Sequence, residues 1–346
     1  MEIVETNLQK YWELFLMKSQ KMSVSKKGLL LGASGAFAAL TGFFVSTLGG
    51  MQATVANPNL NQPTPRLLAQ KLKTLTIVFP SRSDSTDLQT KANAVGSFLS
   101  KELGIPVKAQ IGDDTAAVEA LRANRADVAF LSSRPALKAE QLANARMYLA
   151  EVRANYSGRF TYDSIFVVPA NSQLKSKTTP KATLEQLRGK KMAFTSPTSG
   201  SGFIFPVGEL VKRGFVPNKD RMDGFFGQIT YGGNYSKALD AVVRGQADVA
   251  VVSEYALFPP YISAEDRSKL RVLHKVSGVP AHGIAIDDDV PVVMREKIIN
   301  ALLKLNKPEN NAMFKSLYNS TELVRVDHNR HLKPVREALK NVGMEP

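Results

Sequence analysis

The sequence predicts an α/β fold of two Rossmann-like open-sheet lobes with a ligand cleft between them. Short apolar strands alternate with helices of 3.6-residue periodicity, a pattern typical of parallel sheets with helices on their faces. One helix–strand unit occurs twice, as 117–133 and 238–254, at a constant offset of 121 residues with 7 of 17 positions identical. The repeat favours two similar lobes. The alternative is that helix–strand units of one sheet resemble each other in composition.

The composition is that of a globular protein with a basic surface. The 346 residues are 44% hydrophobic, enough to bury the core of two domains or of two lobes. The formal net charge is +14, but Lys and Arg are spread along the chain without a basic block or an aromatic-interleaved stripe. We therefore expect no nucleic-acid partner, and at most a weak steering of anions.

Few reactive groups are present. The chain has no cysteine, which excludes disulfides, thiolate nucleophiles, Cys zinc sites and a lipoprotein anchor. His328 and His331 stand three residues apart without a carboxylate to complete a metal set. Asp287–Asp289 resembles a cation loop, although an acidic turn before a helix explains it more simply. We expect no enzymatic activity, no cofactor and no metal.

The N-terminal segment has the features of an export signal. No charged residue occurs from Gly28 to Pro65, and two lysines precede this apolar stretch. The small residues Ala53–Ala56 resemble a cleavage site, which predicts a signal over 1–56 and a linker over 57–72. An uncleaved signal anchor is the alternative, because the uncharged run is long enough to span a bilayer.

The first elements after the linker alternate between strand and helix. Leu75–Pro80 is an apolar run stopped by proline, and Leu88–Leu103 has helical periodicity before a glycine. Ile105–Ile111 alternates as a strand, Asp114 can cap a helix, and 127–131 is apolar again. This order predicts a parallel sheet.

Serines follow the two repeated strands. Ser132 and Ser133 end the first copy, and Ser253 lies near the end of the second. Ligands of open α/β sheets bind beyond the carboxyl ends of strands. We therefore expect Ser132 and Ser253 on opposite walls of one cleft.

The segment 195–202 has the composition of an anion-binding loop. It follows the apolar strand Lys191–Phe194 and contains only Ser, Thr, Gly and Pro. Glycines allow close approach of the backbone, and amides at a helix start favour an anion. The loop lacks the Gly-Lys-Ser/Thr of a P-loop and the Gly-x-Ser-x-Gly of a nucleophile elbow. A polar surface turn with a serine cap is the alternative.

Pro197–Ile204 resembles the Pro-Thr-Ser-Thr-Ser-Gly-Tyr-Leu signature of the phosphonate and phosphite substrate-binding proteins of ABC importers. Leu184–Phe194 and Tyr231–Ala250 are similar to the segments around that signature. The resemblance implies a type II periplasmic-binding fold and an exported monomer. Such a protein captures a small oxyanion by closing its lobes and delivers it to the importer's membrane subunits. The alternatives are another small anion (phosphate, a sulfonate, an organic acid) or a membrane-tethered sensor.

Carried over from the family, Ser199, Gly200 and Ser201 would hold the phosphonate oxygens, with Gly200 in place of the family's Thr. Asn234 stands where the family has a His, and Tyr235 beside it would wall the cleft.

The resemblance is weaker at the other end of the ligand. Glu254 lies near a carboxylate that meets an amine in some members, and it could instead accept the proton of a P–OH group. His282 lies where the chain returns to the first lobe, at a place where some members carry an Asp, and Leu131 replaces an aromatic residue. We expect lobe one over 73–166 plus 284–346 and lobe two over 167–283.

Overall fold

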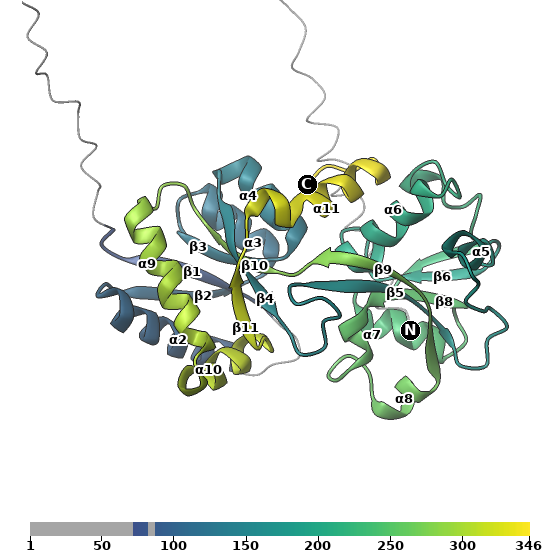
Figure 1. The fold of residues 1–346 in the computed structure, drawn as a ribbon, viewed down its shortest axis with the longest axis horizontal. Helices are drawn as coiled ribbons and strands as arrows, with labels where there is room; N and C mark the ends of the chain where they lie inside the picture. The colour runs from purple at the N-terminus through teal and green to yellow at the C-terminus, as the bar shows by residue number, and fades with distance from the viewer. Residues whose placement is uncertain (1–71, 82–86) are drawn as a thin grey trace, which may run out of the picture. The chain divides into compact units, whose positions relative to one another are not determined.

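The computed structural model describes residues 72–81 and 87–346, which form two β-sheets with helices on their faces (Figure 1). The predicted signal over 1–56 and all but the last residue of the predicted linker lie outside the described residues. In the part of the chain that is described, no helix combines the length and apolarity needed to cross a bilayer. The predicted α/β class with two sheets is confirmed.

The first lobe has a six-stranded sheet in the order β11-β4-β10-β3-β1-β2. Its strands are β1 (Leu75–Pro80), β2 (Val107–Gly112), β3 (Val128–Leu131), β4 (Arg146–Val152), β10 (Gly283–Ile286) and β11 (Glu322–Arg325). β1, β2 and β3 are parallel as predicted, but β10 is antiparallel to both β3 and β4. The parallel arrangement expected for the strands up to residue 131 is confirmed, and the later strands β4, β10 and β11 are antiparallel to their neighbours.

The helices of the first lobe cover this sheet. They are α2 (Leu88–Leu103), α3 (Asp114–Arg122), α4 (Ser133–Ala143), α9 (Val292–Leu303), α10 (Pro308–Tyr318) and α11 (His328–Val342). Helix α2 ends as predicted at Gly104, whose φ of 66° suits a residue without Cβ. The predicted cap of α3 is corrected by one residue: the side chain of Asp113 accepts the Ala116 amide, and Asp114 is the first helical residue.

The second lobe has a five-stranded sheet in the order β7-β6-β8-β5-β9. Its strands are β5 (Thr161–Pro169), β6 (Lys191–Phe194), β7 (Gln228–Tyr231), β8 (Val249–Ser253) and β9 (Leu270–Pro280). The accompanying helices are α5 (Pro180–Glu185), α6 (Phe205–Lys212), α7 (Tyr235–Val243) and α8 (Ala264–Ser268). Helix α11 of the first lobe packs against α6 and β9 of the second.

The two sheets share one topology. In each, three parallel strands (β2-β1-β3 or β7-β6-β8) are followed by an antiparallel strand, β10 or β5. The repeated units of the sequence are α3 with β3 and α7 with β8, which take the same place in their sheets. Both turns between helix and strand use a positive φ, at Asn124 and Gly245. The repeat therefore lies in two lobes and not in one sheet.

Two short segments connect the lobes. Residues 153–160 lead from β4 to β5, and Ala281 and His282 lead from β9 back to β10. The segments touch, since the amide of Ala281 donates to the carbonyl of Phe160 (3.1 Å). The expected boundary between 166 and 167 falls inside β5, which is wholly part of the second sheet, while the boundary at 283/284 falls at the start of β10.

Candidate ligand-binding site

A cavity of about 260 Å³ lies where the two lobes and their connecting segments meet. The first lobe contributes residues at the carboxyl ends of its strands, the connections contribute Arg153 and His282, and the second lobe contributes tyrosines. The lining residues are Pro80, Ser81, Asp113, Asp114, Phe130, Ser132, Arg153, Tyr255, Tyr261, His282 and Tyr318. The position agrees with the rule that open sheets bind ligands beyond their strand ends.

The loop that follows β6 leads into a single π-helical turn. The side chain of Ser199 caps the π-helical turn Gly200–Ile204 by accepting the amide of Gly202 (3.0 Å), and α6 continues directly. The turn thus begins inside the segment that sequence analysis assigned to a loop. A Cβ at Gly202 would lie 2.4 Å from the Cβ of Thr195, whereas a Cβ at Gly200 would meet nothing within 4 Å. Only the second glycine is required by packing.

Ser201 connects this turn to the aromatic wall of the cavity. Its hydroxyl lies 2.8 Å from the hydroxyl of Tyr235, and its carbonyl accepts a hydrogen bond from Ser164 (2.6 Å). Ser201 is fully buried, so its hydroxyl lies behind Tyr235 in this conformation. The ring of Tyr235 packs edge-on against Tyr255 and Tyr261, which line the cavity.

The tyrosines around the cavity are neutral hydrogen-bonding groups. Tyr156, Tyr162 and Tyr255 pack with ring centroids 5.1 to 5.8 Å apart. Burial raises the pKa of each of these three phenols well above its ordinary value. They therefore keep their protons. Tyr156 donates its own to Glu151, whereas Tyr255 lines the cavity and can donate to an anion without adding charge.

The cationic group of the cavity is Arg153, a residue that sequence analysis missed. Its guanidinium lies 5.0 Å from the ring centroid of Tyr255 and donates to Glu151 (3.1 Å). Burial would raise the pKa of Glu151, but the charge of Arg153 and hydrogen bonds from Ser320 and Tyr156 hold that pKa below its ordinary value. The pair is therefore ionised, and Glu151 neutralises much of the positive charge that Arg153 brings to the cavity.

His282 lines the cavity beside this ion pair. Its Nδ1 lies 3.7 Å from the carboxylate of Glu151. Burial lowers the pKa of the imidazole, although the charge of Glu151 opposes the shift. The ring is therefore neutral at physiological pH, so one of its nitrogens can donate a hydrogen bond and the other can accept one.

Ser132 lies at the cavity and is hydrogen-bonded to a carboxylate of its own lobe. Its hydroxyl donates to Asp114 (2.6 Å) and its amide donates to the other oxygen of that carboxylate (3.1 Å). Ser132 and Asp114 also line a second cavity of about 350 Å³, to which Thr198 of the β6 loop contributes from the second lobe. The loop and Ser132 therefore face a common space.

Several predicted site residues lie elsewhere. Ser253 is fully buried on the central strand β8, opposite Ser164, and is not part of the lining, so the expectation that it faces Ser132 across the cleft is wrong. Glu254 accepts the amides of Ser157 (2.7 Å) and Asp163 (3.0 Å) and lines a different cavity of about 340 Å³. It holds the connecting segment in place and is not available to a ligand in the central cavity.

The two remaining predicted residues are at helix starts. Ser133 is buried in the first turn of α4. Asn234 is exposed and caps α7 by accepting the amide of Lys237 (2.9 Å). Neither belongs to the lining of the central cavity.

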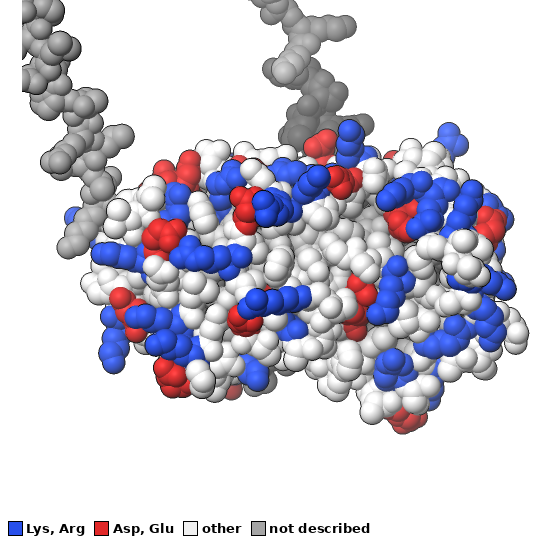
Figure 2. Space-filling model, viewed as in Figure 1, with Lys and Arg blue, Asp and Glu red and all other residues white. Residues whose placement is uncertain are grey.

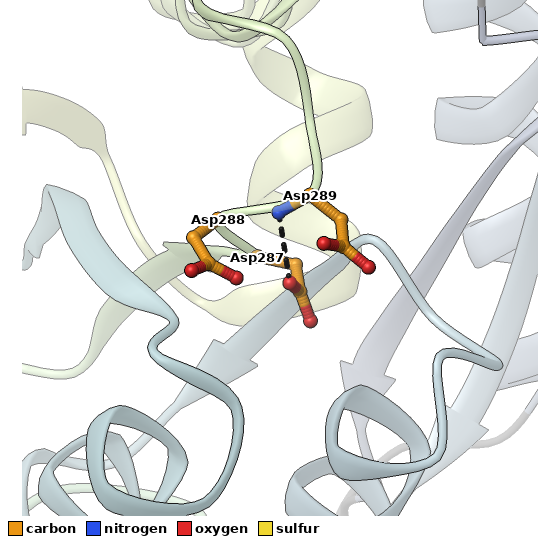
Figure 3. A group of neighbouring side chains, drawn as sticks. All are labelled: Asp287, Asp288 and Asp289. Carbon is orange, nitrogen blue, oxygen red and sulfur yellow. Dashed lines mark hydrogen bonds between the residues drawn. The ribbon is translucent and has the colours of Figure 1, made fainter. Parts of the chain in front are cut away.

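The acidic turn Asp287–Asp289 lies at the opposite edge of the first sheet, where β10 ends (Figure 3). Asp287 accepts the amide of Asp289 (3.1 Å), and the three carboxylates offer oxygens within 4.8 Å of one another. Burial, together with the neighbouring charges of Asp289 and Asp288, raises the pKa of Asp287 to about 6. The turn precedes α9, as the simpler interpretation of the sequence expected.

The family model that matches this chain is that of the ABC transporter, phosphonate, periplasmic substrate-binding protein, over residues 77–332. The chain belongs to this family. The phosphonates-binding periplasmic protein of Escherichia coli is 26% identical over 246 residues, 69% of this chain and 68% of that protein. The phosphate-import protein PhnD of Mycolicibacterium smegmatis is 27% identical over 179 residues, 51% of this chain and 54% of that protein.

Solved structures confirm the fold. A Xanthomonas citri protein bound to chloride has a TM-score of 0.63 at 19% identity, covering 79% of this chain and 99% of its own. PhnD1 of Prochlorococcus marinus in complex with methylphosphonate has a TM-score of 0.61 at 18% identity, covering 78% of this chain and 98% of its own. The predicted family resemblance and the type II periplasmic-binding fold are both confirmed.

Proposed function

We propose that this protein binds a phosphonate or phosphite in the space between its lobes and delivers it to the membrane subunits of an ABC importer. Family membership supports the transport role. The observation that carries the ligand class is the β6 loop, where Ser201 of the π-helical turn is hydrogen-bonded to Tyr235, whose ring packs against two tyrosines that line the cavity. The first amides of a helical turn have no acceptor within it; Ser199 accepts that of Gly202, which leaves those of Gly200 and Ser201 to bind an anion.

The size and polarity of the space fit a small oxyanion. A cavity of about 260 Å³ lies below the roughly 300–1,000 Å³ of drug-sized pockets. Its polar lining consists of phenols, Ser81, Ser132, His282, one arginine and the two aspartates Asp113 and Asp114. The phenols and the arginine can donate hydrogen bonds to an anion, while the aspartates can only accept when ionised. On the face drawn in Figure 2, Lys and Arg are scattered among Asp and Glu and form no continuous stripe, which fits a small ligand better than nucleic acid.

Binding closes the lobes by hinge motion at the two connections, and the importer recognises the closed form. The role requires no chemistry on the ligand, and we propose that the protein acts as a monomer without enzymatic activity. We also propose export to the periplasm with cleavage near Asn57. N-terminal sequencing of the protein recovered from cells tests this, and an intact N-terminus would favour the membrane-tethered sensor.

Calorimetric titration of the purified protein tests the ligand class. The ligands are phosphite, methylphosphonate, 2-aminoethylphosphonate, phosphate and sulfate. We expect tight binding of one of the first three. The double variant S199A/S201A should weaken that binding at least a hundredfold, because it removes both the cap of the turn and the hydroxyl beside Tyr235.

The matched control is Ser316→Ala, an exposed serine on α10 whose hydroxyl donates to a carbonyl of its own helix. This variant should bind like the unmodified protein. If phosphate or sulfate binds most tightly, or if the double variant binds normally, the proposed ligand class is wrong.

A further inference from the structure

The correspondence between the repeated units 117–133 and 238–254 extends to the residues that precede them. At the same offset of 121 residues, Asp113 corresponds to Asn234, and both are helix caps: Asp113 accepts the Ala116 amide (2.8 Å) and Asn234 accepts the Lys237 amide (2.9 Å). The next residue along, which is the first of each helix, is Asp114 in the first lobe and Tyr235 in the second. Equivalent positions of the two lobes therefore carry a carboxylate and a phenol.

These two side chains have opposite hydrogen-bonding properties. The hydroxyl of Tyr235 is paired with Ser201 and can donate, whereas an ionised carboxylate can only accept. Asp114 is held by two donors from Ser132, its hydroxyl and its amide. Since a carboxylate has about four lone-pair sites, Asp114 retains acceptor capacity toward the cavities that it lines.

The first lobe presents Asp114 to the cavity, which makes its side of the cavity poorly suited to a fully ionised oxyanion. Ser132 stands at the start of α4 without a capping bond of its side chain. Its amide and hydroxyl are donors that a ligand anion could have used, but the protein's own carboxylate takes both. Glu254, the acceptor expected from the sequence, binds two backbone amides through one oxygen and lines a different cavity. Two carboxylates line the central cavity: Asp113, which caps α3, and Asp114, which also lines the second cavity and so faces the ligand space from both sides.

Other charged or titratable groups share the space with Asp114. Those of the central cavity are Asp113, Arg153, His282 and the phenols Tyr255, Tyr261 and Tyr318; those of the second cavity, of about 350 Å³, include Glu119, Arg134 and Lys138. Arg153 is paired with Glu151, and Glu119 is paired with Arg122. His282 is neutral above its lowered pKa, so between pH 7 and 9 neither it nor the Glu151 pair changes charge.

We propose that Asp114 determines specificity by accepting a hydrogen bond from the ligand, so that the cleft selects an anion carrying an O–H or N–H donor over a fully ionised one. The inference rests on the proposed function, because it names the state of the ligand bound at that same site. The second lobe then holds the anionic oxygens and the first lobe recognises the proton-bearing end.

The test compares the unmodified protein with Asp114→Asn. Asparagine has nearly the same shape: its carbonyl can still accept the Ser132 amide, and its NH2 group can donate one hydrogen to the Ser132 hydroxyl and the other toward the ligand. Titrations at pH 7, 8 and 9 use methylphosphonate, whose second ionisation removes its only O–H, together with 2-aminoethylphosphonate and sulfate. For the unmodified protein we expect methylphosphonate affinity to fall at least tenfold as the ligand loses this proton. In the variant the fall should disappear, and sulfate should bind at least tenfold more tightly.

The two kinds of ligand donor give different results. If the donor is an ammonium, the variant binds 2-aminoethylphosphonate about tenfold more weakly while methylphosphonate shows no change in its pH profile. The control is Glu102→Gln, which removes one carboxylate from α2, outside both cavities of this lobe.

Three results decide the matter. Loss of the pH dependence or selective loss of the amine ligand supports the role of Asp114. If a phosphonate binds but Asp114→Asn and Glu102→Gln behave alike with every ligand, Asp114 merely links α3 to α4 and the inference is wrong, while the proposed function stands. If neither protein binds any ligand of the panel, the proposed function fails and the inference fails with it.

Discussion

In the first lobe, Ser132 follows β3 and donates to the carboxylate of Asp114, whereas in the second lobe Ser253 ends β8 in full burial. The hydroxyl of Ser253 has no hydrogen-bond partner among the described residues. The two serines occupy matching positions of one repeat and one sheet order. The difference shows that repeated topology fixes where a residue lies along a strand, while the residues packed over the strand end decide whether it can reach a ligand.

A second pair of equivalent positions behaves alike. Asp127 and Asp248 precede β3 and β8, and each accepts the backbone amide of a residue on the neighbouring strand, that of Thr76 (2.6 Å) or Lys191 (2.8 Å). These residues lie at the edge of the sheet away from the cavity. The two lobes therefore make the same hydrogen bond at the edge of the sheet away from the cavity, and their hydrogen bonds differ at the edge near the cavity.

The largest effect is expected at the connection between the lobes. Arg153→Ala should lower the free energy of unfolding by about 3–5 kcal/mol at pH 7, because it leaves the buried Glu151 without its cation. Urea denaturation measures this loss. Arg159→Ala, which breaks the exposed pair with Glu322 in the same segment, should cost no more than about 1 kcal/mol.

The loss at Arg153 should depend on pH. The pKa of Glu151 lies below its ordinary value in the folded protein, so the network stabilises the fold above the unfolded pKa of about 4.3, and this contribution is lost as the pH falls further. In Arg153→Ala the carboxyl can take up a proton, so the deficit should shrink toward pH 4. An equal deficit at pH 4 and pH 8 would contradict the ionised pair.

The second effect concerns the turn that distinguishes the second lobe. Gly202→Ala should destabilise the protein by about 1–3 kcal/mol, since its Cβ would overlap Thr195. Gly200→Ala is the matched control, because its Cβ meets nothing within 4 Å. Thermal unfolding of both variants compares them. Equal stability would show that the turn is looser than the distances imply.

The third effect is confined to the first lobe. Burial and neighbouring charges raise the pKa of Asp287 to about 6, so its contribution to stability is present below the unfolded pKa of about 3.9 and is lost as the pH rises through 6. Asp287→Asn should therefore stabilise the protein by about 1–2 kcal/mol at pH 8 and not at pH 4.

The second lobe offers a control of opposite sign for this effect. Hydrogen bonds from Lys269 and Ser263 lower the pKa of the partly exposed Asp266, so Asp266→Asn should not stabilise at any pH. Urea midpoints measured from pH 4 to pH 8 follow both variants. A pH-independent effect of Asp287→Asn would refute the raised pKa.

The smallest effect tests the two serines directly. Ser132→Ala removes a hydrogen bond to a carboxylate and should cost about 1–2 kcal/mol. Ser253→Ala removes a buried hydroxyl without a partner and should be neutral or stabilise by up to about 1 kcal/mol. Denaturation of the two variants under identical conditions compares them, and equal losses would mean that Ser253 does have a partner.

Sequence patterns predicted the elements whose signals are local. The strand Leu75–Pro80, the helix ending at Gly104 and the strand Lys191–Phe194 follow from apolar runs, periodicity and glycine chemistry, and the structure confirms all three. The antiparallel β10 was not predicted, because four apolar residues carry no information about strand direction. The repeat correctly indicated two lobes.

The cavity was predictable only in part. Local motifs led to the β6 loop, Ser132 and His282, of which Ser132 and His282 line the central cavity. Arg153, Asp114 and Tyr255 were missed as cavity residues because they belong to no motif. They are far apart in the sequence and come together only in the folded protein. One signal was available: extending the repeat by three residues upstream pairs Asp114 with Tyr235.

The position of β10 between β3 and β4 has a consequence for the order in which the chain folds. All strands of the second sheet come from residues 161–280, an uninterrupted stretch, whereas the first sheet has an empty place between β3 and β4 until residues 283–286 arrive. During synthesis or emergence from a translocation channel, the second lobe can therefore acquire its complete sheet first, while β3 and β4 keep unpaired edges. Pulse-labelling hydrogen exchange should find β8 protected before β3, and simultaneous protection would show that the lobes fold as one unit.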